Sequence, residues 1–366
     1  MRKPPLRILL PLLLVAAPLC AAPPLLSQAP SLAERLELAL PELMQRAGIP
    51  GLSIALTSHG EQAWSGAFGV KSLDTNEPID GATVFEAASL SKPVFAYAVL
   101  RLVERGELDL DESLAESLPN ERMSHDDRYL AITPRMVLSH SSGLPNWGGE
   151  RLELNFDPGS SFNYSGEGFV YLQKVVEKRT GLTLDELAQR EVFEPLGMKR
   201  SSYVWREDFE DNCSARHDSA GHASALSQDT EGNAAASLLT TAEDYARFLS
   251  AVFRGKGLEK ETRAAMLRPE RSLAGASWGD DEEAKEQLSW GLGWGLQASG
   301  EDLAFWHWGD NGSAKAFTMV DIETGEGFVY FANSVSGLAI AEALVDLVFG
   351  LPSPALRFLD YEQHDD

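Results

Sequence analysis

Ser89 and Lys92 are the residues whose types and spacing most directly suggest covalent chemistry in this chain. A serine hydroxyl is a poor nucleophile until a base removes its proton. The apolar run after Lys92 predicts a helix that begins at Ser89, which places the two side chains, three positions apart, on one face of its first turn. Lys92 can act as the base only if the fold keeps its amine neutral. By itself the Ser-x-x-Lys pattern also fits an ordinary helix start with a solvated lysine.

Two further segments carry side chains suited to the same chemistry. Tyr164, in a Tyr-Ser-Gly sequence, can exchange protons if nearby cations depress the pKa of its phenol. His307, in a His-Trp-Gly sequence, ends a predicted strand and can hydrogen-bond a substrate or the Tyr164 oxygen. Gly309 would let a substrate backbone approach the edge of that strand. Taken singly, Tyr164 is more commonly explained as a packed loop tyrosine, and a strand-end histidine is an equally ordinary explanation of His307.

Two other patterns suggest different hydrolases. Gly275–Gly279 fits the G-x-S-x-G nucleophile elbow around Ser277, but that elbow must follow a buried strand, and the flanks here are polar. We therefore predict a polar loop. His217 and His222 lie five positions apart without a suitable carboxylate, so a solvated loop is favoured over a metal site, and neither a metal nor a cofactor is expected.

The elements that must position these residues are strands at the two ends of the chain and helices between them. A capping box at Ser31–Glu34 starts a helix that we expect to kink at Pro41 and to end at Gly48. The hydrophobic pattern further predicts strands over 51–58, 62–70, 290–296, 303–307, 316–321 and 327–332, and helices over 89–106, 169–179, 184–192, 242–253 and 338–349. This order predicts an α+β fold in which one antiparallel sheet is flanked by terminal helices and a helical subdomain is inserted. We expect the site in the cleft between the two parts.

The start of the chain is typical of a secretory signal peptide. A basic beginning precedes the apolar run at 8–17 and the small residues Ala21-Ala22, which predicts a signal over 1–22 and a periplasmic or secreted protein. An uncleaved anchor is the alternative, although the run is short for a membrane span, and Leu19 argues against lipid attachment at Cys20. Cleavage would leave Cys213 alone, so no intrachain disulfide is expected.

The remainder is predicted to be a single catalytic domain over 31–352. Its sheet part covers 31–88 and about 225–352, its helical part covers about 89–224, and a polar tail follows over 353–366. The formal net charge of −24 repels nucleic acid and anionic lipid, so neither is an expected partner. No stable membrane span is expected once the signal is removed.

The three motifs occur in the order, and at roughly the separations, of the S-x-x-K, Y-x-N and K-T-G or H-x-G motifs of the serine β-lactamase-related family. The chain resembles the branch that holds class C β-lactamases, D-alanyl-D-alanine carboxypeptidases and family VIII carboxylesterases. Further similar stretches are TPRMVLSHSSGLP at 133–145, EPLGM at 194–198 and SLLTTAEDYARF at 237–248. The similarity extends over about 31–349.

This resemblance implies a β-lactamase/transpeptidase-like fold and a serine hydrolase mechanism. Ser89 would attack an acyl carbon and form an acyl-enzyme, while Lys92 and Tyr164 would move the protons. The backbone N–H groups of Ser89 and Asp310 would form the oxyanion hole. Water would then release the acyl group.

Two departures from the family pattern bear on the substrate. Gly166 replaces the usual Asn, which commonly contacts a substrate amide, and His307 replaces the Lys with which β-lactamases hold the substrate carboxylate. These changes favour small esters or D-amino-acid-containing peptides, including peptidoglycan-derived ones. A β-lactamase and a non-catalytic penicillin- or cell-wall-binding protein of the same fold are the alternatives.

Overall fold

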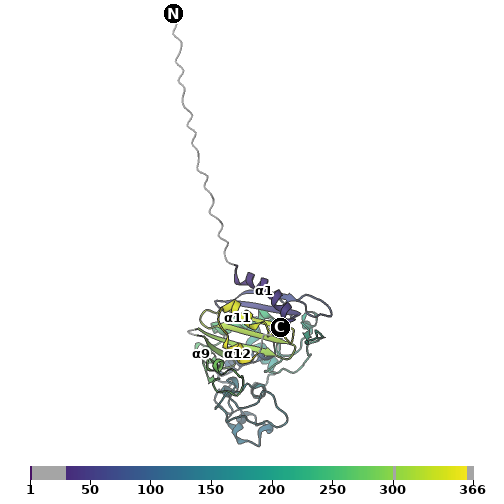
Figure 1. Cartoon of the computed structure of the whole chain (residues 1–366). Helices are drawn as coiled ribbons and strands as arrows, with labels where there is room; N and C mark the ends of the chain where they lie inside the picture. The colour runs from purple at the N-terminus through teal and green to yellow at the C-terminus, as the bar shows by residue number, and fades with distance from the viewer. Residues whose placement is uncertain (2–29, 300–301, 361–366) are drawn as a thin grey trace.

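The computed structural model describes residue 1 and residues 30–299 and 302–360, so the predicted signal peptide, apart from residue 1, lies outside the described residues (Figure 1). Its centre is a sheet of eight strands in the order β2-β1-β12-β11-β10-β9-β8-β7, with every neighbouring pair antiparallel. The strands are β1 (Gly51–Ser58), β2 (Glu61–Gly69), β7 (Arg271–Ser272), β8 (Leu288–Trp290), β9 (Gly295–Ser299), β10 (Asp302–Asp310), β11 (Lys315–Asp321) and β12 (Gly327–Ala332). The first and last strands of the chain lie side by side, with Leu52 opposite Ala332.

One face of the sheet is covered by helices from the two ends of the chain. These are α1 (Leu32–Ala47), α11 (Ala341–Phe349) and α12 (Pro354–Leu359), and they lie in front of the strands in Figure 1. Leu40 and Leu344 of these helices share a buried cluster with Ile54, Trp306 and Tyr330 of the strands. Burial of these alternate strand positions fixes the register of the sheet.

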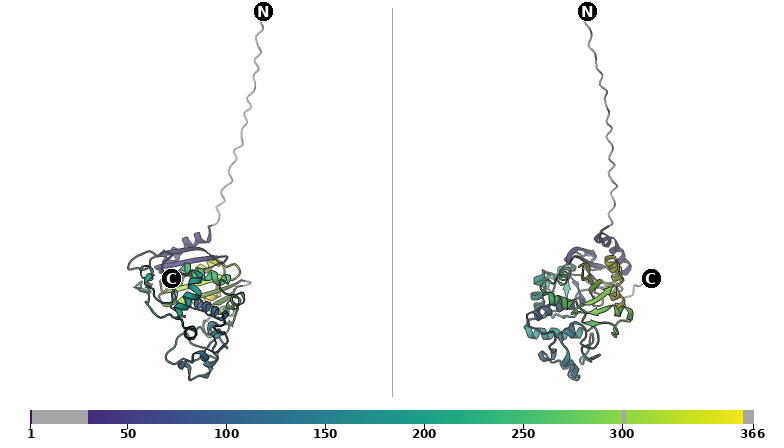
Figure 2. Two further views of the ribbon diagram at one scale, coloured as in Figure 1. Left: turned by 180° about the vertical axis from the view of Figure 1, so that it is seen from behind. Right: turned by 90° about the vertical axis from the view of Figure 1, so that its left-hand side faces the viewer.

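The opposite face packs against the helical part of the molecule, which lies on the other side of the sheet from α1 and α11 in the right panel of Figure 2. The helices are α2 (Ser91–Glu104), α3 (Leu114–Ser117), α4 (Pro134–Leu138), α5 (Gly166–Thr180), α6 (Leu184–Ala188), α7 (Glu194–Leu196), α8 (Ala242–Arg254) and α9 (Lys260–Met266). The short helix α10 (Glu282–Glu286) lies instead on the face of the terminal helices, where Ala284 belongs to their buried cluster. The tighter turns are η1 (Ala88–Leu90), η2 (Glu121–Met123), η3 (Asp127–Ala131) and η5 (Glu207–Asn212), with a π-helical turn η4 (Gln189–Phe193). Two short pairs complete the structure, β3 (Phe85–Glu86) with β6 (Leu239–Thr240) and β4 (Arg216–His217) with β5 (Ala223–Ser224).

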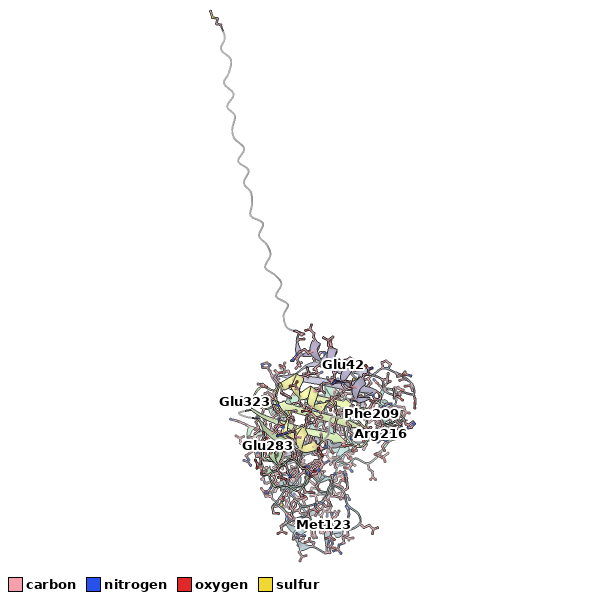
Figure 3. The ribbon with its side chains drawn as sticks, in the orientation of Figure 1. Glu42, Met123, Phe209, Arg216, Glu283 and Glu323 are labelled. Carbon is pink, nitrogen blue, oxygen red and sulfur yellow. The ribbon has the colours of Figure 1, made fainter. Side chains whose placement is uncertain are left out.

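Helix α2 lies at the centre of this arrangement because its side chains are buried on every face, from Lys92 to Leu100. A helix that is apolar all round must be enclosed. Its first turn therefore lies inside the protein, between the sheet and the helical part. Glu42 on α1 and Met123 in η2 lie at the top and at the bottom of the folded part in Figure 3, which shows how far the helical part extends from the terminal helices.

The α+β fold predicted from the sequence is confirmed, as are most of its elements. Helix α1 begins at the Ser31 capping box and ends at Gly48, whose φ of +63° is the left-handed conformation typical of a helix terminus. The helix continues through Pro41 to Ala47. The boundaries predicted for the sheet and helical parts, near 88 and 225, stay predictions. Among the helices of the described ranges, none combines the length and apolarity needed to cross a bilayer.

The single strand predicted over 290–296 is wrong, because the segment forms the two strands β8 and β9. The chain reverses between them, with the Gly291 N–H bonded to the Trp294 carbonyl at 2.8 Å and Gly293 at φ +91°. A Cβ on Gly293 would lie 2.5 Å from the Ala96 side chain. This turn is buried against α2, so it contains apolar residues where an exposed turn would carry polar ones.

The polar tail predicted over 353–366 is wrong for residues 354–359, which form α12. The Ser353 side chain accepts a hydrogen bond from the Leu356 N–H, and Pro354 occupies the first turn, so the helix has an ordinary start. Phe358 is 2% exposed and belongs to the cluster under the terminal helices. Pro354, Ala355 and Phe358 are buried, and Leu356 and Leu359 pack partly against the same cluster, so this mainly apolar segment docks as a helix; residues 361–366 lie outside the described part.

Candidate active site

Ser89 lies in η1, immediately before α2 rather than within it, and its side chain is partly exposed. The preceding Ala88 has φ +48°, a left-handed conformation that is unfavourable for a residue with a side chain. Buried hydrogen bonds hold this turn: Ser91 Oγ donates to the Ala88 carbonyl at 2.6 Å and accepts from the Leu238 N–H at 2.9 Å. The surrounding structure thus fixes the serine in a strained, accessible turn.

Lys92 is completely buried beside this serine. Its Nζ lies 3.0 Å from Ser89 Oγ and donates a hydrogen bond to the Ala235 carbonyl at 2.8 Å. It also lies 4.6 Å from the centre of the Tyr164 ring. Burial without a carboxylate partner holds the pKa of Lys92 well below its usual range. Burial therefore favours the neutral amine, which is the form that the prediction from the sequence required.

Tyr164 packs in a cluster of aromatic rings next to Lys92 and is 5% exposed. The ring centres of His140 and Trp308 lie 4.3 Å and 4.6 Å from its own, and that of Trp278 lies at 5.1 Å. These contacts hold the tyrosine ring beside the lysine amine. The structure therefore brings together all three predicted catalytic side chains.

His307 lies in β10 and is also fully buried. Its Nδ1 donates to the Trp308 carbonyl at 2.8 Å, which leaves Nε2 as an acceptor that finds no hydrogen-bond partner within the described ranges. Burial first, and the nearby Lys92 second, lower the pKa of His307 to about 3. The imidazole is therefore neutral near pH 7 and does not replace the permanent cation that a lysine would supply.

Gly309 lies where β10 meets the nucleophile's turn. A Cβ at this position would lie 2.4 Å from the Ala87 carbonyl oxygen and 3.2 Å from the Ala88 side chain. The glycine is thus required by the chain's own packing, in addition to any approach of a substrate. Strand β9 pairs with β10 only as far as Trp306, so the segment from His307 to Asp310 extends beyond it.

Asp310 ends this strand, and its carboxylate is occupied. The Lys315 Nζ lies 2.5 Å from Asp310 Oδ1, which also accepts the Gly312 N–H at 2.9 Å. The side chain therefore points into its own turn and not toward the serine hydroxyl. Its role in the site, as predicted, is confined to the backbone N–H.

Replacing Gly309 with alanine is expected to reduce activity and stability together. The added methyl must push the Ala87–Ala88 segment away, which would displace Ser89 by a fraction of an ångström and lower kcat by about 100-fold. We expect a loss of about 1–3 kcal/mol in the free energy of unfolding, from denaturant titration. Gly149→Ala is the control, because a Cβ there meets no atom within 4 Å. A Gly309→Ala protein with full activity would show that the turn is not held by this contact.

His140 is a site residue that sequence reasoning did not identify. It is fully buried with φ +53°, and its Nδ1 accepts the Ser165 N–H at 3.0 Å while its ring stacks on Tyr164. Burial holds the pKa of His140 well below its usual range. Its position in the 133–145 stretch gave a resemblance but no role, because the contact depends on tertiary structure.

Trp278 was also missed, and it comes from the predicted polar loop at 275–279. That region is a loop, as predicted, and Ser277 is exposed, so the nucleophile-elbow alternative has no support from its geometry. Lys285 is buried and its Nζ donates to the Ala276 and Gly279 carbonyls, each at 2.8 Å. The loop is therefore fixed and delivers Trp278 to Tyr164 on one side and to Phe358 of α12 on the other.

The two histidines considered as metal ligands have separate roles. The solvated position favoured for His217 is wrong: it is fully buried, accepts the Leu73 N–H at Nε2 and contacts the Asn333 carbonyl through Nδ1. His222 is exposed and contacts Asp218. Within the described ranges no group of three or more His, Cys, Asp or Glu side chains is arranged to hold a metal ion.

In this geometry a partly exposed serine hydroxyl lies 3.0 Å from a buried lysine amine. A family model described as "Beta-lactamase" matches residues 36–349, so the chain belongs to the β-lactamase family, as its motifs indicated. The family includes esterases, penicillin-binding proteins and β-lactamases.

Individual proteins support the same assignment. The chain is 23% identical to "Penicillin-binding protein 4*" of Bacillus subtilis, over 80% of this chain and 71% of that protein. It is 32% identical to "Esterase EstB" of Burkholderia gladioli, over 49% of this chain and about half (53%) of that protein's length. A class C β-lactamase structure superposes with a TM-score of 0.72 at 18% identity, covering 86% of this chain and 96% of the other, which confirms the fold.

Proposed function

We propose that the chain is an exported serine hydrolase that forms an acyl-enzyme on Ser89 and acts on small, uncharged esters. The observation that carries the proposal is the contact between Ser89 Oγ and a buried, neutral Lys92 amine at 3.0 Å. A neutral amine can accept the hydroxyl proton as the oxygen attacks. A solvated, charged lysine could not.

The reaction then follows from the remaining groups. Ser89 Oγ bonds to the acyl carbon as Lys92 takes its proton, and the N–H groups of Ser89 and Asp310 stabilise the oxyanion. The proton passes through Lys92 and Tyr164 to the departing alcohol oxygen, and the C–O bond breaks. Water then attacks the acyl-enzyme by the reverse path and releases the acid.

The charge of the site supports uncharged substrates. Burial lowers the pKa of His307 to about 3 and holds the pKa of Lys92 well below its usual range, and Lys315 is paired with Asp310. A substrate carboxylate, such as that of a penicillin or of a peptide ending in D-alanine, would find none of these three side chains available as a cation. The relationship to an esterase points the same way.

Export rests on the sequence of residues 1–22 and remains part of the proposal. It places the enzyme in the periplasm or outside the cell. The mass of the protein recovered after expression with its own N-terminus tests it, since cleavage after Ala22 removes a defined segment.

A substrate panel tests the activity itself. The purified protein is assayed with p-nitrophenyl acetate, a peptide ending in D-Ala-D-Ala and a chromogenic cephalosporin, and the acyl-enzyme is trapped and located by peptide mass mapping. We expect the ester to give the highest kcat/KM and the acyl group to be found on Ser89. Preferred turnover of the peptide or the cephalosporin would overturn the ester assignment, and stable acylation without turnover would favour a binding protein.

A further inference from the structure

Trp147 occupies the space that a side chain at position 166 would need. A Cβ on Gly166 would lie 2.7 Å and 2.8 Å from the indole Cη2 and Cζ2 atoms and 2.9 Å from the Asn146 carbonyl oxygen. Real Cβ atoms do not approach other atoms so closely, so the glycine and the tryptophan fit as a pair. The indole is nevertheless 54% exposed, which is unusual for so large an apolar side chain.

The direction of position 166 places this indole next to the catalytic cluster. Ser165 is extended, with φ −138° and ψ 113°, so side chains at 164 and 166 point to the same side of the chain. Tyr164 points to Lys92, whereas the Ser165 hydroxyl points away and donates to the Pro145 carbonyl. The indole therefore lies against position 166, on the side of the chain to which the Tyr164 side chain also points.

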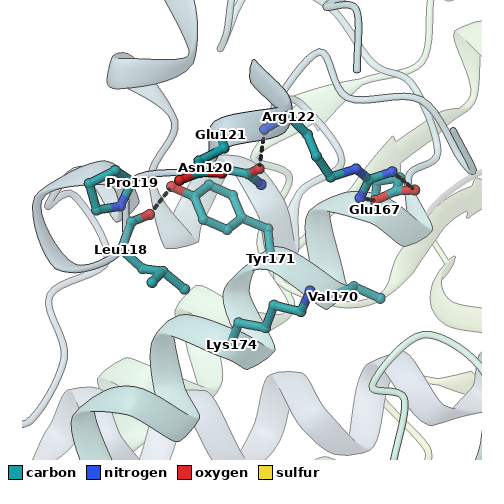
Figure 4. A pocket seen from close by; sticks show the side chains of 9 residues that line it. All are labelled: Leu118, Pro119, Asn120, Glu121, Arg122, Glu167, Val170, Tyr171 and Lys174. Atoms are coloured by element: carbon teal, nitrogen blue, oxygen red, sulfur yellow. Dashed lines mark hydrogen bonds and ion pairs between the residues drawn. The ribbon is translucent and has the colours of Figure 1, made fainter. Parts of the chain in front are cut away.

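The loop that carries Trp147 is clamped on both sides. On one side, the Asn146 carbonyl accepts the N–H groups of Gly166 and Glu167, each at 3.0 Å. On the other side, Arg122 of η2 pairs with Glu167 of α5 at 2.7 Å, and Figure 4 shows the two side chains facing each other. The same guanidinium donates to the Gly148 and Gly149 carbonyls at 3.1 Å and 2.6 Å, and Glu167 Oε1 accepts the Gly148 N–H at 3.1 Å. A loop whose backbone is held by this many contacts presents its exposed indole with little further ordering of the backbone.

We infer that Trp147 is a specificity-determining residue, whose indole face receives an aromatic or bulky apolar group of the ester substrate. Stacking on a fixed indole favours such groups over a small acetyl or ethyl group. The inference rests on the proposed function, because it names the substrate class of the same site. Gly166 has no side chain that could make a polar contact with the substrate. The indole of Trp147 offers an apolar surface in that place.

Selectivity measured on matched esters tests this inference. The ratio of kcat/KM for p-nitrophenyl phenylacetate to that for p-nitrophenyl acetate is expected to fall about tenfold in Trp147→Ala, mainly through KM. Trp147→Phe should keep most of the ratio because a ring remains. Leu130→Ala, which removes another exposed apolar side chain, is the control and should leave the ratio as it is.

Two further arms complete the experiment. An alcohol series, phenyl acetate against ethyl acetate, shows whether the bulky group belongs to the acyl or to the alcohol part, and a fall in either ratio supports the inference. Glu167→Gln breaks the ion pair and should lower the affected ratio by a smaller factor while leaving the serine reactive. Equal losses on small and bulky esters in Trp147→Ala, or no loss at all, would overturn the inference. Failure of the proposed function is distinct, because the wild-type protein would then not react with a fluorophosphonate probe.

Discussion

Replacing Ser89 with alanine is expected to lower ester turnover by about 10⁴–10⁶-fold and to abolish labelling by a fluorophosphonate probe. The hydroxyl is the atom that bonds to the acyl carbon, and no neighbouring group takes its place. The side chain is only partly buried and the turn is held through Ser91 and Leu238, so the variant should fold normally. Turnover of p-nitrophenyl acetate and in-gel fluorescence measure the two effects.

Ser277→Ala provides the matched control for this prediction. Ser277 lies in an exposed loop inside the G-x-S-x-G pattern, and the strand before that pattern, β7, is a two-residue edge strand and not a buried core strand. We expect full labelling and full turnover from this variant. Labelling that survives in Ser89→Ala, or that disappears in Ser277→Ala, would assign the nucleophile elsewhere.

Replacing Lys92 with methionine is expected to lower the acylation rate by about 10³–10⁴-fold and to stabilise the fold at the same time. Methionine fills a similar buried volume but cannot accept the Ser89 proton. Stopped-flow acylation with p-nitrophenyl acetate measures the first effect. In the wild type, acylation should decline as the pH falls through the depressed pKa of Lys92, because the amine is then protonated and no longer a base.

The stability effect depends on pH in a defined direction. The unfolded chain binds a proton on Lys92 up to its ordinary pKa of about 10.5, whereas the folded chain binds it only below a much lower pKa. The neutral lysine therefore costs stability between these two values, and the cost shrinks as the pH rises toward the upper one. Denaturant titration should find Lys92→Met more stable than the wild type at pH 7, with the difference smaller at pH 9.5.

Lys92→Arg supplies the contrast. An arginine stays charged, so its burial at a completely enclosed position should destabilise the protein by about 3–5 kcal/mol as well as remove the base. If Lys92→Met were less stable than Lys92→Arg at pH 7, the lysine would have to be charged in the folded protein. Its assignment as the base would then be wrong.

Sequence patterns predicted those parts of the fold and site that depend on local signals. The capping box at Ser31 started α1 where expected, and short apolar runs bounded by turn residues located the long strands. The Ser89 and Lys92 pair was found because a three-residue spacing on a helical turn is a local property. Helix α2 actually starts at Ser91, two residues after the predicted start at Ser89. The sequence did not predict this because the strained conformation of Ala88 comes from packing against β10 and not from the local sequence.

The parts that were missed depend on contacts between distant segments. The β8–β9 turn looked like strand because burial against α2 replaced the polar residues of an exposed turn. His140 and Trp147 carry no local signal, since their roles arise from contacts with 164–166, about twenty residues further along. Gly166 was recognised as a departure from the family, but only the structure shows that an indole fills the space.

The pairing of β1 with β12 has a consequence for how this protein comes to be folded. Strand β1 leaves the ribosome early, whereas β12, which lies between β1 and β11, is among the last segments to be made. The pairing of β1 with β12 cannot form before β12 has been made. Pairings between segments so distant along the chain also form slowly. Until then the apolar strands are open to aggregation and to chaperones. A nascent chain in that state is still unfolded, and an unfolded chain is narrow enough to pass through a secretion channel.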